Sequence, residues 1–168
     1  NVRNIYIGIL GYAWLGTYNH GLILMKGKRY IQLPIDENKR LSVINSIFED
    51  RRGRIWFSTN NGLLHTNKIS ILNYFNKKGS IEPYLIYDKS DGLLTNEFNG
   101  GATPDKVFLS GDRISIPSLK SLVIFNPDEF PKENTANKVY IRRIVIDDKI
   151  INDLSSISLP SDYKSMTV

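Results

Sequence analysis

The sequence is organised around the stretch Ile47–Leu63, which reads IFEDRRGRIWFSTNNGL. This stretch predicts a strand, a charged turn, a second strand, a polar turn and the start of a third strand. Gly53 and Gly62 suit turns that need a left-handed residue. Between the two turns, Ile55–Phe57 is a β-favouring run without a breaker, long enough for one buried strand.

The same pattern occurs earlier in the chain. Trp14 and Trp56 lie 42 residues apart, and their neighbours align at the same offset until one inserted residue shifts the second turn. A period of roughly 40 to 45 residues with four short strands per unit is typical of a β-propeller blade. The recurring signature consists of Trp14, Thr17 and Gly21 in the first copy, and of Asp50, Gly53, Trp56, Thr59 and Gly62 in the second.

A third, degraded copy follows. Gly111–Ile116 supplies its turn and strand, and Leu122–Phe125 supplies the next strand. Ser115 stands where the other copies have Trp, and Ser121 stands where they have the second glycine. Because no segment shows helical periodicity of useful length, the chain is predicted to be all-β, a partial propeller of four-stranded antiparallel blades.

The blade signature resembles the two-component regulator propeller repeat. That repeat builds the periplasmic sensor half of hybrid two-component systems in Bacteroidetes. The order Asp91–Leu93, Asn96–Phe98 and then Phe125–Pro127 is similar to the way the last blades of such sensors end. The first copy departs from the family pattern at Gly8, where the second copy has Asp50.

The resemblance also implies a domain organisation. The stretches Val139–Ile146 and Ile157–Pro160 resemble the opening strands of the Ig-like domain with recurrent tyrosines that follows the propeller in this family. The expected divisions are C-terminal propeller blades in 1–130 with repeats near 2–33, 42–75 and 84–125, a linker in 131–138, and the incomplete start of an Ig-like β-sandwich in 139–168.

Local patterns give three further expectations. The fourth strand of the second blade is placed at 69–75, and the last blade is expected to begin with a strand at 98–103. Asp147–Lys149 is expected to form a hairpin turn. Two and a half blades followed by the start of another domain predict a fragment of a longer protein, whose missing blades are among its partners. Because an open wedge of blades exposes strand edges on both sides, the fragment alone is expected to be marginally stable, oligomeric or domain-swapped.

Composition excludes several classes of protein. With 41% hydrophobic and 23% charged residues, the 168-residue chain resembles folded rather than disordered proteins, and it has no apolar run long enough to span a membrane. The absence of cysteine excludes disulfides, thiolate catalysis and Cys-based metal sites. The basic residues behind the net charge of +5 are scattered over predicted turns and strand surfaces, which argues against a nucleic-acid-binding stripe.

No group of residues predicts catalysis. His20 and His65 have no carboxylate or serine partner at a recognisable spacing. The pair Glu49 and Asp50 is expected to bond turn amides, and Gly100–Gly101 does not have the form of a phosphate-binding loop. We therefore predict no catalytic residue, no cofactor and no metal site in this fragment.

Ligand contacts are expected on the loops that differ between copies. Tyr12, Tyr18, Asn19 and His20 offer the flat aromatic faces and hydrogen-bonding groups that suit a sugar, although ordinary exposed turn residues would look the same. Trp14 and Trp56 recur in equivalent positions, which favours packing over ligand binding.

The resemblance implies a function for the whole protein. It would be a hybrid two-component histidine kinase and response regulator whose periplasmic ectodomain, anchored through the full-length protein in the inner membrane, senses oligosaccharides from polysaccharide breakdown. The protein would be a homodimer that relays the signal through its Ig-like domains, with the kinase outside this non-enzymatic fragment. Two alternatives remain: a propeller-type glycan lyase or hydrolase, and a basic β scaffold that binds anionic polysaccharide or nucleic acid.

Overall fold

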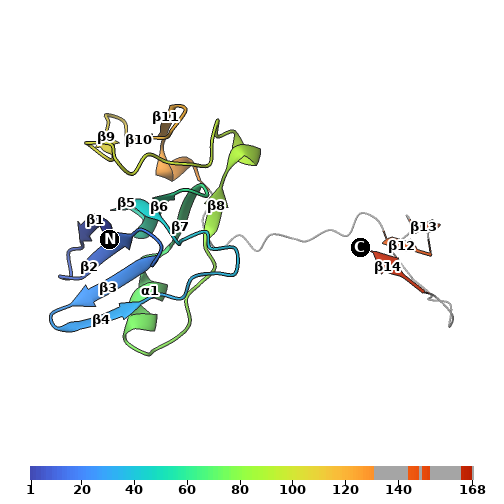
Figure 1. Cartoon of the computed structure of the whole chain (residues 1–168), viewed down its shortest axis with the longest axis horizontal. Coiled ribbons are helices and arrows are strands. Elements are labelled where there is room, and N and C mark those ends of the chain that lie inside the picture. The colour runs from blue at the N-terminus through green and yellow to red at the C-terminus, as the bar shows by residue number, and fades with distance from the viewer. Residues whose placement is uncertain (131–143, 148, 152–163, 168) are drawn as a thin grey trace. The chain divides into compact units, whose positions relative to one another are not determined.

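The computed structural model describes residues 1–130, 144–147, 149–151 and 164–167 (Figure 1). The chain divides into two compact units, Asn1–Glu133 and Asn134–Val168. Three antiparallel sheets form the first unit, and one small sheet lies in the second. The predicted linker at 131–138 lies outside the described residues.

The first sheet is a four-stranded meander in the order β1-β2-β3-β4. In this sheet Trp14 is paired between Tyr6 on one neighbouring strand and Leu24 on the other. The sheet therefore has the order predicted for the first repeat. Its strands are β1 (Val2–Ile7), β2 (Ala13–Thr17), β3 (Leu22–Lys26) and β4 (Arg29–Gln32).

The second sheet repeats this plan in the order β5-β6-β7-β8. Phe48 lies opposite Trp56, as Tyr6 lies opposite Trp14 in the first sheet. The same register in both sheets shows that the sequence repeat is a structural repeat. The strands are β5 (Ile44–Glu49), β6 (Arg54–Thr59), β7 (Leu63–Asn67) and β8 (Leu85–Tyr87).

The strand predicted at 69–75 is wrong, because these residues belong to helix α1 (Lys68–Phe75) between β7 and β8. The side chain of Asn67 caps the helix by accepting a hydrogen bond from the backbone N–H of Ile69, and Leu72 and Phe75 are buried on the sheet. The fourth strand of this sheet is instead β8. The second repeat therefore extends beyond residue 75, and β8 does not open the third repeat.

The third sheet has three strands in the described part of the chain, in the order β11-β10-β9. The strand expected at 98–103 is absent there: Phe98 makes one isolated bridge, to Ser118. The strands are β9 (Val107–Phe108), β10 (Ile114–Pro117) and β11 (Leu122–Phe125), with 3-10 turns η1 (Lys89–Asp91) before them and η2 (Pro127–Glu129) after them.

A hydroxyl closes the polar turn between the second and third strands of each blade. This contact explains why Thr recurs at that position, and it identifies Ser118 as the counterpart in the degraded copy. The turn glycine of the second blade is also required sterically, since a Cβ on Gly62 would lie 2.5 Å from the carbonyl oxygen of Tyr87. The donors and accepting carbonyls are Thr17 to Gly21 at 2.8 Å, Thr59 to Gly62 at 2.9 Å and Ser118 to Ser121 at 2.8 Å.

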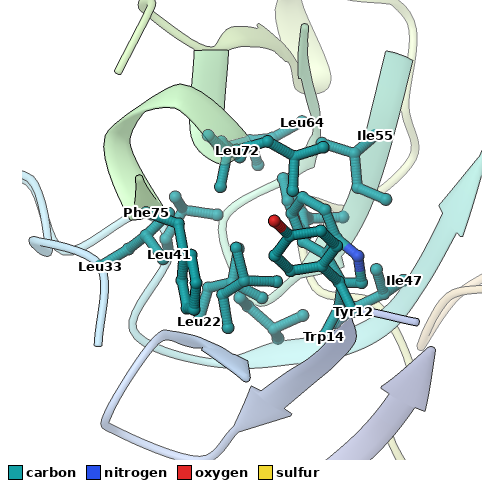
Figure 2. Close-up of a cluster of buried hydrophobic side chains, with 14 residues drawn as sticks. Tyr12, Trp14, Leu22, Leu33, Leu41, Ile47, Ile55, Leu64, Leu72 and Phe75 are labelled. Atoms are coloured by element: carbon teal, nitrogen blue, oxygen red, sulfur yellow. The ribbon is translucent and has the colours of Figure 1, made fainter. Parts of the chain in front are cut away.

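Two buried clusters join the three sheets face to face. Between the first and second sheets, Trp14 and Leu24 pack with Ile47 and Phe57, and α1 covers the cluster (Figure 2). On the other face of the second sheet, Trp56 packs among residues of the third sheet. Stacked antiparallel sheets of this kind confirm the predicted partial propeller.

The second unit contains β12 (Ile144–Ile146), β13 (Lys149–Ile151) and β14 (Met166–Thr167), in the order β13-β12-β14. β12 and β13 form the predicted hairpin, with Ile146 opposite Lys149. The carboxylate of Asp147 accepts hydrogen bonds from two backbone N–H groups before β14. Most of 139–168 lies outside the described residues, so the Ig-like domain stays a prediction. Across the described parts of both units, no helix has the length and hydropathy needed to cross a membrane.

Candidate ligand-binding site

The four predicted ligand residues do not form one site, because the length of β2 separates Tyr12 from the other three. Tyr12 is only 7% exposed and meets the ring of Phe75 edge-on, with 5.4 Å between ring centroids. The ammonium group of Lys26 lies 4.4 Å from the Tyr12 ring centroid. Tyr12 is therefore a core residue (Figure 2).

The other three residues form an exposed turn at the opposite end of β2. Tyr18 is 42% exposed, and Asn19 has a φ of 73°, a left-handed conformation that Asn tolerates. The hydroxyl of Thr17 accepts a hydrogen bond from the backbone N–H of His20 at 3.1 Å. Gln32 donates to the carbonyl of His20 at 3.0 Å, so the turn is held from both sides.

The side chain of Arg3 lies between this turn and the segment that contains Gly100. Its guanidinium lies 4.9 Å from the centroid of the Tyr18 ring, a cation–π contact. On its other side the backbone of Gly100 comes so close that an added Cβ would lie 2.8 Å from Nη1 of Arg3 and 2.2 Å from Oδ1 of Asn45. Only glycine fits at position 100 without displacing one of these side chains.

Asn45 connects the two sides of this cluster. Its side-chain amide donates to Oδ1 of Asn60 at 2.9 Å and to the carbonyl of Phe98 at 3.0 Å. Asn45 is 3% exposed, so its amide is fixed by these bonds. The sequence-based hypothesis missed Arg3 and Asn45, which lie in or beside predicted strands and come near Tyr18 and Gly100 only after folding.

A hollow of about 540 Å³ lies beside the turn. Asn19 lines it together with Asp36, Lys39 and Ser42. The carboxylate of Asp36 accepts a hydrogen bond from the backbone N–H of Arg40 at 3.1 Å, which orders this wall. A ring face, amides, a carboxylate and an ammonium group thus surround one end of the first blade, and these groups can bind hydroxyls by hydrogen bonds and a sugar ring by stacking.

A second polar cluster joins β1 and β5 to the residues directly before β9. The carboxylate of Asp105 accepts from Asn4 at 2.8 Å, from Ser46 at 2.5 Å and from Lys106 at 2.9 Å. Burial raises the pKa of Asp105, but the bonds from Ser46 and Lys106 and the charge of Lys106 outweigh it, so the pKa lies below its usual value. Asp105 is therefore a structural anion that links three sheets.

The acidic residues at the charged turn also have structural partners. Glu49 forms an ion pair with Lys68 and accepts a hydrogen bond from the hydroxyl of Tyr6. Burial and the charge of Glu49 raise the pKa of Tyr6 to about 12, which keeps the phenol neutral. Among the described residues, no group of three or more His, Cys, Asp and Glu side chains is placed to hold a metal ion.

The central stretch of the sequence matches a known family. Residues 39–61 fit the model of the two-component regulator propeller. The chain carries a two-component regulator propeller repeat. The matched residues cover β5, β6 and the turns beside them, which together contain most of the second copy of the signature.

Two longer proteins resemble most of the chain. It is 28% identical over 152 residues to histidine kinase P4 of Formosa agariphila, covering 90% of this chain and 10% of the kinase. The extracellular domain of a putative hybrid two-component system from B. thetaiotaomicron has the same fold, with a TM-score of 0.59 and 24% identity over 98% of this chain and 20% of that domain. The chain thus spans only a tenth to a fifth of these relatives.

Proposed function

We propose that this chain is part of the periplasmic ligand-sensing domain of a hybrid two-component histidine kinase and response regulator. The observation that carries the proposal is the propeller repeat at residues 39–61, which coincides with the centre of the second blade. The resemblance to a histidine kinase along 90% of the chain supports the same assignment. The fragment itself binds and transmits, and the kinase that anchors the protein in the inner membrane lies outside it.

The remaining blades of the propeller are the first partner of this chain. Ile5, Leu15 and Ile23 share the outer face of the first sheet by their pairing, and Ile5 is 61% exposed. In the repeat they correspond to Ile47, Phe57 and Leu64, which are buried in the cluster that packs the second sheet on the first. The exposed face of the first sheet is therefore built like a face that receives another blade.

The proposed ligand is an oligosaccharide from polysaccharide breakdown. Tyr18, Asn19 and His20 would contact it, with Arg3 holding the Tyr18 ring from one side. A stacked ring face with amide and charged neighbours is a combination that orients a sugar by hydrogen bonds and packs against its C–H groups.

The signal would leave through the segment after β11. Arg52 donates to the carbonyls of Asp128 at 2.6 Å and Phe130 at 3.0 Å, and Arg54 donates to the carbonyl of Pro127. These hydrogen bonds attach the segment after β11 to the charged turn of the second blade. A shift of that blade would therefore move the chain that leads to the Ig-like domain, and the homodimer would relay this movement.

Thermal unfolding of the complete ectodomain in the presence of a panel of oligosaccharides tests the proposal. A ligand at a hundred times its Kd stabilises by about 2.7 kcal/mol, which raises Tm by several degrees. We expect one glycan class to raise Tm without being consumed. Tyr18→Ala should abolish the shift, whereas Tyr30→Ala, on β4 at 69% exposure, should retain it.

Each other result would contradict the proposal in its own way. Consumption of the glycan would indicate a lyase or hydrolase. Binding that weakens steeply with salt and ignores sugar identity would indicate a charged scaffold. If no glycan changes Tm, the proposal that the ligand is an oligosaccharide is wrong.

A further inference from the structure

Two stretches of the chain that lack acidic residues meet at the β4 edge of the first sheet. No Asp or Glu occurs in residues 1–35 or in residues 68–81, although both stretches contain several Lys and Arg residues. Because α1 lies beside β4 (Figure 1), the fold brings together cations that are far apart in the sequence. None of them forms an ion pair with a residue that the structure describes. The cations are Lys26, Lys28, Arg29, Lys77 and Lys78.

Arg29 is held on one side and stays open on the other. Its Cζ lies 4.3 Å from the centroid of the Phe75 ring, and its Nη2 donates a hydrogen bond to the Phe75 carbonyl. Within the described part of the chain, the other guanidinium nitrogens have no hydrogen-bond partner. The planar fork of Arg donors matches the oxygens of a carboxylate or a similar oxyanion. Because its position is already fixed, this guanidinium is preorganised to bind an anion.

Lys77 occupies a backbone position that glycine usually takes. It follows Asn76, the C-cap of α1, and has a φ of 59°. The backbone N–H groups of Lys77 and Lys78 donate to the carbonyls of Tyr74 at 3.0 Å and Asn73 at 2.8 Å, which turns the chain back at the helix end. Glycine would adopt this left-handed conformation without strain. The turn itself therefore does not need a lysine.

Arg29 and Lys77 line the same groove, which has a volume of about 440 Å³. We call it the basic groove. Its concave form suits a small ligand better than a flat membrane surface, and sugar-binding sites combine apolar surface with a few polar groups in the same way. The groove offers both kinds of surface, from Ile31, Gln32, Tyr74 and Phe75.

Gln32 connects the basic groove to the candidate ligand-binding turn. It lines the groove, and its side-chain amide donates to the carbonyl of His20 at 3.0 Å. Arg29 and Gln32 are the two ends of β4, so about 10 Å of extended chain separates them. An oligosaccharide that contacts Tyr18–His20 can therefore extend along β4 toward Arg29 and Lys77.

We propose that the basic groove is the acidic-group subsite of the oligosaccharide site, in which Arg29 and Lys77 bind a carboxylate or sulfate group of the sugar. This inference rests on the proposed function, because it specifies the class of the same ligand as an acidic glycan fragment. Arg29 donates hydrogen bonds through the guanidinium nitrogens that Phe75 does not use, and the ammonium group of Lys77 balances the charge. The anion displaces no protein carboxylate, since neither cation has an ion-pair partner among the described residues.

Binding of matched acidic and neutral glycans to the complete ectodomain tests this assignment. The probes are tetrasaccharides from polygalacturonate, alginate and chondroitin sulfate, each paired with a form whose carboxyl groups are reduced and whose sulfates, where present, are removed. In calorimetry at physiological salt, we expect one acidic glycan to bind and its neutral form to bind at least tenfold more weakly. Selectivity among acidic glycans of equal charge would distinguish this subsite from a scaffold that binds by charge alone.

Lys77→Gly is the most informative variant, because glycine suits the left-handed position and the fold should not be weakened. We expect it to bind the acidic glycan about tenfold more weakly and the neutral form with unchanged affinity. Arg29→Lys keeps the charge but loses the fork of donors, so it should also bind more weakly. Lys120→Gln is the matched control: it removes one positive charge from the exposed turn between β10 and β11 and should retain the wild-type affinity.

Four results would overturn the inference. Equal affinity of Lys77→Gly and wild type for the acidic glycan would show that the groove does not hold the anion. Tyr18-dependent binding that is equal for acidic and neutral forms would overturn this inference alone and leave the proposed function standing. Lys77-dependent binding to phosphatidylglycerol vesicles, without competition from any acidic glycan, would assign the groove to a membrane surface. If no oligosaccharide binds, acidic or neutral, this inference fails together with the proposed ligand.

Discussion

Asp50 shows how one side chain can hold a turn together. Its carboxylate accepts hydrogen bonds from the backbone N–H groups of Arg52 at 2.9 Å and Arg54 at 3.0 Å, from Nε of Arg54 at 2.6 Å and from Nε1 of Trp56 at 2.7 Å. The side chains of Asp50 and Arg54 are 3% and 4% exposed. A buried ion pair with this many partners is costly to break, because removing one member leaves the other charge unpaired.

Asp50→Ala should therefore lower the free energy of unfolding by about 3–5 kcal/mol, measured by urea denaturation. Arg51→Ala is the matched control. Its ion pair with Asp112 joins side chains that are 74% and 42% exposed, so its loss should cost at most about 1 kcal/mol. Similar losses in the two variants would show that burial does not set the strength of these pairs.

His65 is buried and is held in its neutral form. Its ring centroid lies 4.3 Å from that of Trp56, and its Nε2 lies 3.1 Å from the hydroxyl of Tyr87. Burial and the charge of Arg54 lower the pKa of His65 to about 4, against an opposing effect of Asp50. The role is structural, as expected for a histidine inside a strand.

The depressed pKa of His65 predicts a loss of stability in acid. An unfolded histidine binds a proton near pH 6.5, whereas folded His65 does so only near pH 4. Between these values the unfolded state binds more protons than the folded state. The free energy of unfolding therefore decreases as the pH is lowered from about 6.5 to about 4, by on the order of 3 kcal/mol in total. His65→Phe should flatten the dependence of the unfolding free energy on pH over that interval. An unchanged slope would contradict the assignment.

Among the elements, α1 differs in type from the sequence-based prediction, which placed a strand there. Its residues KISILNYF include two isoleucines, a tyrosine and a phenylalanine, which are residue types that favour a strand locally. Asn67 starts the helix, and Ile71, Leu72 and Phe75 are then buried on one side while Ile69 remains 53% exposed. Burial against the sheets outweighs the local preference.

The cap should contribute measurably. Asn67→Ala removes the hydrogen bond to the N–H of Ile69 and should destabilise the first unit by about 1 kcal/mol in chemical denaturation. Asn67→Ser keeps an accepting oxygen and should lose much less. Equal effects of the two substitutions would mean that α1 is held by packing alone.

At the scale of the whole molecule, the stacking of the sheets decides whether a given repeat position is buried and how much it contributes to stability. Ile5 and Ile47 are equivalent in the repeat, yet Ile47 is fully buried and Ile5 is 61% exposed. We expect Ile47→Ala to cost about 2–5 kcal/mol and Ile5→Ala at most about 0.5 kcal/mol in this chain. In a longer ectodomain that supplies the preceding blade, the cost of Ile5→Ala should rise toward that of Ile47→Ala. A cost that stays small there would contradict the proposed blade contact.

The sequence predicted the part of the fold that repeats. Turn glycines, the Ile-Trp strand and the closing threonine specify local geometry through short-range hydrogen bonds and alternating burial, so they can be recognised within one copy. The degraded third copy was harder to read, because Ser118 performs the role of Thr59 with a hydroxyl alone and lacks the neighbouring glycine.

The candidate site was predicted only in part, since it depends on contacts between distant residues. Tyr18–His20 could be recognised as a variable turn, but Tyr12 belongs to the core because it occupies the buried place that Arg54 has in the second blade. Arg3, Asn45 and Gly100 meet beside Tyr18 only because the three sheets stack.

By itself the sequence determined the all-β class, the blade repeat and the turns, because each of these is set by residues within one period of the chain. Tertiary structure alone decided that 68–75 is a helix and that β8 closes the second blade. These outcomes depend on which apolar faces meet, and burial of a face is worth more than the local propensity of the residues that form it.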